Sequence, residues 1–277
     1  MQQILGLHPC GSRQTGWRPP PHSAVRPSQF ARLRGQAQRA LCGSALAYTL
    51  AHGAPALAGT SGVLTPLAAP AGMALLSSSQ QRADYGPLAE TFLTQANLAY
   101  CGVASGVMAL NSLAVPAPPA SGYGRYRFWT QDNLFAAEAS RAVLEPEQVA
   151  RHGMTLQQLR ALLASTGVQA TAIHGDALNL AAFRRLVAAN LANPSDRLLV
   201  NYLRSSLGQQ GGGHISPLAA YHASSDRVLL LDVARYRYPS VWVPLQALWH
   251  AMRTIDSDSG RSRGLVVVGR APSTPSP

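Results

Sequence analysis

Four strand-like runs in the second half of the chain restrict the fold more than any other feature of the sequence. They read RLLVNYLR (197–204), HISPLAAYH (214–222), RVLLLDVARY (227–236) and GLVVVGR (264–270). Glycine- and serine-rich turns separate them, and runs of this length and composition are typical of β-strands. We therefore predict an antiparallel sheet in the second half of the chain.

The segment that follows Cys101 has the pattern of a helix. Four apolar residues recur there at helical spacing: Val103, Val107, Leu110 and Ala114. This spacing puts them on one face of a helix, and the prolines that come next cannot continue it. Cys101 therefore stands at the N-terminus of a predicted helix.

Three further segments have helical composition. In GMTLQQLRALLASTG, Thr155 is the expected N-cap, Gln158 follows three residues later and Gly167 is the expected C-cap. This is the pattern of a capping box. The other two segments are TQDNLFAAEASRAVL (130–144) and NLAAFRRLVAANL (179–191). Helices that precede an antiparallel sheet predict an α+β fold.

The residues before Asp84, the first acid of the chain, differ in composition from the rest. Residues 1–39 are rich in proline and arginine, and an apolar run (40–51) and an Ala-x-Ala site ending at Ala58 follow. A basic region, a short apolar run and a small-residue site are typical of a secretory signal peptide. Two alternatives stay open, an organellar transit peptide and a disordered alanine-rich tail.

We accordingly predict four parts of the chain: a leader with a signal peptide (1–58), a linker (59–78), a folded domain (79–270) and a disordered tail (271–277). The apolar run of the leader is too short to span a bilayer, so we expect no integral membrane span. The expected compartment is the bacterial periplasm, with the cytoplasm as the alternative.

The net charge of +11 raises the question of nucleic-acid binding. All 23 basic residues are arginine, and six of them fall in residues 1–58, which contain no acid. The other 17 arginines accompany 12 acidic residues and form no stripe interleaved with aromatic side chains. We therefore expect no nucleic-acid partner.

The chain has three cysteines, Cys10, Cys42 and Cys101. No disulfide framework and no zinc-ligand spacing can be built from them, so we predict no metal site. If the leader is removed, Cys101 is the one thiol that remains.

Cys101 is a candidate nucleophile because a thiolate attacks carbonyl groups, and a helix N-terminus and a nearby histidine both favour the thiolate. His214 begins one predicted strand and Asp232 lies on the next. A turn at 223–226 would fold these strands into a hairpin. His214 and Asp232 then lie roughly across from each other, as an imidazole and the acid that orients it require.

Each of these residues also has an ordinary structural explanation. A lone cysteine is more often a small buried side chain. His222 competes with His214 because it lies on the same face of the same strand. Asp232 interrupts an apolar run, and a buried carboxylate is costly unless it is paired, so Asp232 needs a partner.

Three segments of the chain resemble phytochelatin synthases, most closely the short bacterial type. They are QANLAYCGVASGVMALNSL (95–113), GGGHISPLAAYH (211–222) and DVARYRYPSVWVPLQALW (232–249), and the resemblance runs from about Tyr85 to Val268. It implies a papain-like cysteine peptidase fold with the catalytic cysteine at a helix N-terminus.

The resemblance also implies roles for four residues of the site. Cys101 would be the nucleophile, His214 the general base and acid, and Asp232 the group that orients the histidine. Gln95 lies six residues before Cys101, the spacing at which papain-like enzymes place a glutamine that donates to the oxyanion.

For substrate binding the resemblance implies Arg235 and Tyr238, with Arg204 as a further candidate. The family transfers γ-glutamylcysteinyl groups from glutathione, which carries two carboxylates, and an arginine fork suits a carboxylate. Glutathione is therefore the expected substrate, and the γ-Glu-Cys group would pass to water or to a second glutathione.

Plant-type members of the family carry a cysteine-rich C-terminal region, whereas no cysteine follows Cys101 here. We therefore expect hydrolysis to exceed transfer. No cofactor is expected to be required, and cadmium or another thiophilic metal would act through the substrate thiolate. A homodimer is a further expectation. Two other functions stay open, a general papain-like cysteine peptidase and a non-enzymatic metal-binding protein.

Overall fold

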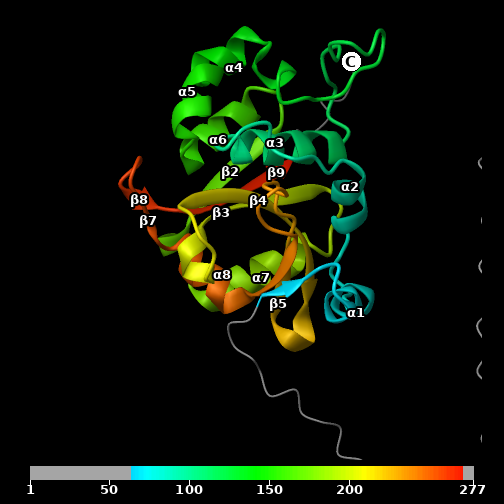
Figure 1. Cartoon of the computed structure of the whole chain (residues 1–277), viewed down its shortest axis with the longest axis vertical. Helices are drawn as coiled ribbons and strands as arrows, with labels where there is room; N and C mark the ends of the chain where they lie inside the picture. The colour runs from blue at the N-terminus through cyan, green and yellow to red at the C-terminus, as the bar shows by residue number, and fades with distance from the viewer. Residues whose placement is uncertain (1–63, 271–277) are drawn as a thin grey trace, which may run out of the picture. The chain divides into compact units, whose positions relative to one another are not determined.

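A seven-stranded antiparallel sheet forms the centre of residues 64–270, the residues that the computed structural model describes (Figure 1). Its strands run in the order β1-β6-β5-β4-β3-β9-β2. They are β1 (Thr65–Pro66), β2 (Gln169–His174), β3 (Asp196–Leu203), β4 (Gly213–His222), β5 (Arg227–Leu230), β6 (Val241–Pro244) and β9 (Gly264–Gly269). A separate ribbon pairs β7 (Ile255–Asp256) with β8 (Arg261–Ser262).

Eight α-helices accompany the sheet within the described residues. They are α1 (Pro70–Ser78), α2 (Tyr85–Glu90), α3 (Cys101–Ser112), α4 (Glu138–Val143), α5 (Pro146–His152), α6 (Leu156–Ala164), α7 (Leu180–Asn190) and α8 (Leu245–Met252). Helices α3 to α6 gather on one side of the sheet and α7 and α8 on the other (Figure 1). The predicted α+β layout is confirmed.

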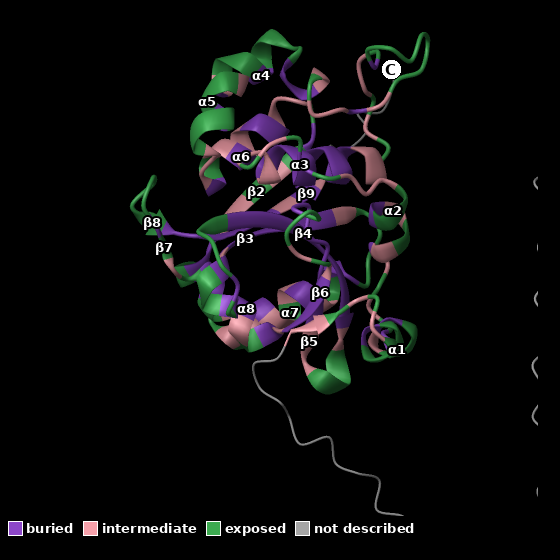
Figure 2. Cartoon of the chain, viewed as in Figure 1, coloured by how far each residue is buried: buried purple, intermediate pink, exposed green. Residues whose placement is uncertain are grey.

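Both faces of the sheet are covered by helices. Leu199 of β3 belongs to a hydrophobic cluster with residues of α3 and α6, whereas its neighbour Val200 belongs to a cluster with residues of α7 and α8. Successive side chains of a strand point to opposite faces, so a strand covered on both sides is apolar along its whole length. Figure 2 accordingly shows β3 and β4 as mostly buried.

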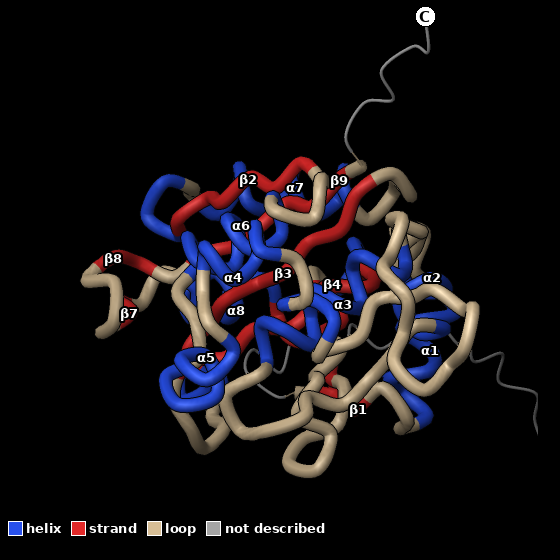
Figure 3. Tube along the Cα trace, turned by 90° about the horizontal axis from the view of Figure 1, so that it is seen from above, coloured by secondary structure: helices blue, strands red, loops and turns tan. Residues whose placement is uncertain are grey.

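Helix α3 begins at Cys101 as predicted and lies against β4 (Figure 3). It is buried from Gly102 to Leu110, and not only along the predicted face. Small residues allow this close packing: a side chain at Gly102 would come within 2.6 Å of the Met154 sulfur. Ala114 was expected on the helix but lies beyond its end, exposed and with φ of +49°.

The predicted start of α6 is confirmed and its predicted C-cap is wrong. Thr155 and Gln158 form the expected capping box, but the C-cap is Ser165, and Gly167 takes a positive φ two residues later. The segment 130–144 was predicted as one helix and is instead divided into a 3-10 turn (Asn133–Phe135) and α4.

The predicted strand 227–236 is shorter than expected. The β4–β5 hairpin forms, with His222 opposite Arg227, but β5 ends at Leu230. The carboxylate of Asp232 accepts a hydrogen bond from the main-chain N–H of Ala234 at 2.9 Å, so the chain turns there instead of extending. Asp232 was predicted to lie on this strand, but it lies in the loop that follows β5.

Residues 64–78 are part of the folded unit, which corrects the predicted linker 59–78. Thr65 of β1 is paired with Trp242 of β6, and the Trp242 indole N–H donates to the main-chain oxygen of Gly72 in α1 at 2.9 Å. The segment has the composition of a linker, but pairing with residues far along the chain holds it in the folded unit. The predicted leader (1–58) and tail (271–277) lie outside the described residues.

Among the helices of residues 64–270, none is both long enough and apolar enough to cross a membrane.

Candidate active site

Cys101 is the first residue of α3, and its sulfur lies where two main-chain N–H groups converge. The N–H groups of Gly102 and Ile215 hydrogen-bond to the sulfur. The hydroxyl of Ser105 donates to the main-chain oxygen of Ile215 at 3.1 Å, which ties the first turn of α3 to β4. The side chain of Cys101 is half-buried. The helix N-terminus thus presents donors and a positive dipole end to the thiol.

His214 of β4 is hydrogen-bonded to Cys101. Burial raises the pKa of the Cys101 thiol, but the hydrogen bond and charge of His214 together with the main-chain N–H groups outweigh it, so the pKa is lowered. Burial lowers the pKa of His214, but its bonds to Asp232 and Cys101 outweigh that effect and raise it. Both shifts favour a thiolate beside an imidazolium.

Asp232 is in contact with the other side of the histidine ring. The His214 Nε2–H donates to Asp232 Oδ1 at 3.0 Å, so Nδ1 is the ring nitrogen left for Cys101. Burial would raise the pKa of Asp232, but its hydrogen bonds to His214 and Arg204 lower the pKa to about 2. The predicted need of this carboxylate for partners is therefore met by an imidazole and a guanidinium.

Arg204, a predicted substrate-binding candidate, is bound to the carboxylate of Asp232 in this structure. Its Nη1 and Nη2 donate to the two oxygens of Asp232 at 2.8 and 2.9 Å, and Nη1 also donates to Gln209 at 2.6 Å. Only 4% of Arg204 is exposed. Its guanidinium is therefore committed to Asp232, and sequence reasoning missed this contact because no local pattern pairs the two residues.

Tyr238, also predicted to bind substrate, connects two loops of the site. Its ring centre lies 4.8 Å from the guanidinium carbon of Arg204. Its hydroxyl accepts a hydrogen bond from the main-chain N–H of Gln210 at 2.7 Å. Tyr238 thus joins the loop after Asp232 to the glycine-rich segment before His214.

Arg235, the remaining predicted substrate residue, is exposed. Its guanidinium carbon lies 5.6 Å from the ring centre of Phe92, and it has no hydrogen-bonded acid within residues 64–270. Arg237, also exposed, lies two residues along the same loop. This loop therefore presents cationic side chains to solvent beside the residues that hold Asp232.

Gln95 is buried in the loop before α3. Its main-chain N–H donates to the oxygen of Val233, next to Asp232, at 3.0 Å. Its side-chain Nε2 donates to the main-chain oxygen of Asn97 at 2.7 Å and to the hydroxyl of Tyr236 at 3.0 Å. Sequence reasoning missed Tyr236, since nothing in DVARYRYP distinguishes it from the neighbouring aromatic residue.

His222 is not brought to the thiol. It lies at the opposite end of β4 from His214, where its Nδ1 contacts the hydroxyl of Ser225 at 2.7 Å and its Nε2 that of Ser78 at 3.2 Å. The structure therefore brings His214 and not His222 to Cys101.

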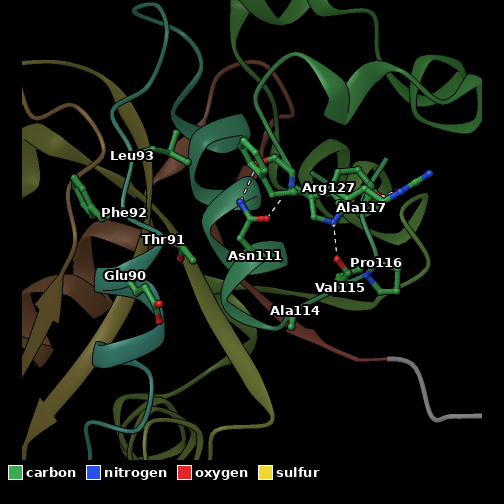
Figure 4. A pocket seen from close by; sticks show the side chains of 12 residues that line it. Glu90, Thr91, Phe92, Leu93, Asn111, Ala114, Val115, Pro116, Ala117 and Arg127 are labelled. Atoms are coloured by element: carbon green, nitrogen blue, oxygen red, sulfur yellow. Dashed lines mark hydrogen bonds between the residues drawn. The ribbon is translucent and has the colours of Figure 1, made fainter. Parts of the chain in front are cut away.

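A cavity of about 820 Å³ lies at the other end of α3 (Figure 4). Phe92, Asn111, Arg127 and Trp129 are among the residues that line it, and Cys101 is not. Both polar atoms of the Asn111 side chain are bound to the main chain of Trp129. Across the described residues, no three His, Cys, Asp or Glu side chains are grouped so that they could hold a metal ion.

A half-buried thiol at a helix N-terminus, bonded to an imidazole that a carboxylate holds from behind, is the arrangement by which enzymes activate a cysteine nucleophile. The comparison with known proteins agrees with this class. The model of the phytochelatin synthase family matches residues 61–265. The chain belongs to the phytochelatin synthase family.

Several curated proteins are similar to this chain. Glutathione gamma-glutamylcysteinyltransferase 3 of Lotus japonicus is 36% identical over 190 residues, which are 68% of this chain and 38% of that protein. Glutathione gamma-glutamylcysteinyltransferase 2 of Arabidopsis thaliana is 35% identical over 65% of this chain and 38% of its own length. Glutathione gamma-glutamylcysteinyltransferase of Schizosaccharomyces pombe is 31% identical over 67% of this chain and 43% of its own length. The chain thus spans less than half the length of these relatives.

Proposed function

We propose that this chain is a thiol acyltransferase and hydrolase that acts on glutathione. Cys101 would attack the carbonyl carbon of the Cys–Gly bond and release glycine, leaving a γ-Glu-Cys thioester. The observation that carries the proposal is the continuous contact from Cys101 through His214 to Asp232. The activity in the names of the similar proteins supports the choice of glutathione.

The groups around Cys101 suit both halves of such a reaction. In the first half the thiolate forms the S–C bond, and the His214 imidazolium gives its proton to the amine of the departing glycine. In the second half the neutral imidazole takes a proton from the incoming acceptor. Asp232, whose pKa is lowered to about 2, stays ionised throughout and stabilises the imidazolium.

We further propose a papain-like arrangement of this site. A helix whose first residue is the cysteine packs on an antiparallel sheet whose strand β4 carries the histidine. Gln95 would serve the oxyanion in this arrangement, as its burial beside the start of α3 supports.

For substrate binding we propose Arg235, with Arg237 beside it. Both are exposed cations on the loop that follows Asp232, whereas Arg204 is already bound to a carboxylate. Glutathione has two carboxylates at neutral pH, and an uncommitted guanidinium can bind one of them through two hydrogen bonds.

Water and a second glutathione would compete for the thioester. Transfer to glutathione needs an amine bound next to the acyl group, because proximity is what allows a dilute acceptor to compete with solvent. Residues 102–277 contain no cysteine that could recruit a metal-bound thiolate acceptor. We propose that γ-Glu-Cys is the main product and that cadmium, where it acts, binds the substrate thiol.

The test is product analysis with purified protein and a series of glutathione concentrations, with and without cadmium. Release of glycine with γ-Glu-Cys as the main product, and phytochelatin rising with glutathione, is the expected result. The Cys101→Ser variant is the matched control and should release no glycine. Cleavage of long peptides without glycine release from glutathione would instead identify a general cysteine peptidase.

A further inference from the structure

The side-chain amide of Gln95 has no N–H left for an oxyanion in this structure. A primary amide has two N–H hydrogens, and here they go to the main-chain oxygen of Asn97 at 2.7 Å and to the hydroxyl of Tyr236 at 3.0 Å. The amide orientation follows from chemistry, because exchanging its two end atoms would place Oε1 against the carbonyl oxygen of Asn97. An oxyanion can therefore bind Nε2 only by replacing one of these acceptors.

The two acceptors differ in how firmly they are held. Asn97 lies in the turn that leads into α3, where its side chain accepts from the N–H of Ala99 and its carbonyl oxygen also accepts from the N–H of Tyr100. Tyr236 is 56% exposed on the loop after Asp232. Within residues 64–270 its hydroxyl makes no other hydrogen bond than the one to Gln95. The tyrosine is the acceptor that can leave.

We propose that the Tyr236 hydroxyl is a placeholder for the oxyanion at Gln95. It accepts the second N–H of the amide in the free enzyme, and the carbonyl oxygen of the substrate replaces it when Cys101 attacks. Since an N–H group donates along one direction, the phenol oxygen marks where the oxyanion binds. On this reasoning Tyr236 competes with the substrate oxygen for the amide of Gln95 and is not a catalytic residue.

The buried Oε1 of Gln95 supports this reasoning. It has no hydrogen-bond partner within the described residues, so the amide is held by its two N–H bonds and by the chain alone. The bond to Asn97 and the main-chain bond of Gln95 to Val233 keep the amide in place, so the tyrosine hydroxyl fills the second N–H in the free enzyme but is not needed to aim it. The inference rests on the proposed function, because it assumes that Gln95 serves the oxyanion.

The direct test is the Tyr236→Phe variant, which keeps the ring and removes the hydroxyl. We expect kcat/KM for glycine release to rise ~2- to 5-fold, because the substrate oxygen no longer has to displace a protein hydrogen bond. In a Gln95→Ala background the same change should have no effect. Tyr123→Phe is the matched control, since Tyr123 is similarly exposed at 58%, and it should leave the rate unchanged.

Two results would overturn the proposal. A fall in kcat of ~10-fold or more in Tyr236→Phe, at unchanged KM, would mean that the phenol itself donates to the transition state. The same rise in the Gln95→Ala background would mean that Tyr236 acts through some other group.

A second measurement does not depend on glutathione as the substrate. The thiol of Cys101 should add across the C=O of N-acetyl-S-methylcysteinal, forming the S–C bond and placing the proton on oxygen, and that oxygen would lie at the oxyanion position. Tyr236→Phe should bind this aldehyde ~2- to 5-fold more tightly, but not in the Gln95→Ala background. Weaker binding overturns the inference. A protein that binds the aldehyde as expected but releases no glycine would contradict only the proposed function.

Discussion

Replacement of Arg204 by methionine tests how Asp232 stays ionised in a buried site. Methionine keeps most of the side-chain length and removes both charge-assisted bonds to the carboxylate, at 2.8 and 2.9 Å. Asp232 is 1% exposed, so the variant leaves a buried charge with His214 and one N–H group as its remaining partners. Loss of one member of a buried ion pair costs ~3–5 kcal/mol of unfolding free energy.

The pH dependence of the unfolding free energy gives a second magnitude for the contribution of the Asp232 carboxylate. Bonds to His214 and Arg204 overcome the effect of burial and lower the pKa of Asp232 from 3.8 to about 2 in the folded state. A lowered carboxyl pKa stabilises the fold above pH ~3.8, and this contribution is lost as the pH falls toward 2. At 1.36 kcal/mol per pKa unit the contribution is about 2 kcal/mol at neutral pH. The Arg204→Met variant should lose part of this contribution to stability.

The assay combines urea unfolding at pH 7 with the pH profile of glycine release. We expect Arg204→Met to unfold at a lower urea concentration and to lose ~10-fold or more in kcat, with little change in KM, because His214 is less well oriented. Arg184→Met is the matched control. It removes a bidentate pair with Asp226 that is 39% and 34% exposed and is worth ~0–1 kcal/mol.

The reasoning would be refuted by a higher KM at unchanged kcat and unchanged stability. That result would return Arg204 to the substrate-binding role that the sequence suggested. Equal stability losses in Arg204→Met and Arg184→Met would also contradict the reasoning. Burial would then make no difference to the free energy that an arginine–aspartate pair contributes.

Three further predictions follow from the structure and the sequence. Cys101→Ser and His214→Ala should each abolish glycine release in folded protein, and the double variant should be no worse than either, as steady-state rates can measure. Burial raises the pKa of Asp84 to about 7 despite its bond to Arg197. The folded protein therefore keeps a proton on Asp84 that the unfolded chain loses near pH ~4, so the unfolding free energy of the wild type should fall relative to that of Asp84→Asn as the pH rises from ~4 to ~7. A pH-independent difference in urea midpoints would contradict this. N-terminal sequencing of protein from the native host should give a start near Gly59, and an intact N-terminus within residues 1–40 would rule out export.

Local patterns determined the elements that carry the site. The capping box of Thr155 and Gln158, the helix beginning at Cys101 and the strand with His214 near its start all follow from residues close together in the sequence. These patterns are informative because caps, helical periodicity and turn residues act within a few positions of each other. The hairpin between β4 and β5 was predictable for the same reason.

Only the tertiary structure decided how the polar side chains pair. The contact of Arg204 with Asp232 spans 28 positions and that of Gln95 with Tyr236 spans 141. Both depend on where β5 ends and on the irregular register between β4 and β5 near Leu218, which alternation along a strand does not encode. The same holds for residues 64–78, whose small and apolar residues resemble a linker until β1 is paired with β6. The sequence therefore specified the thiol, the imidazole and the carboxylate, whereas long-range packing chose the partners that hold them.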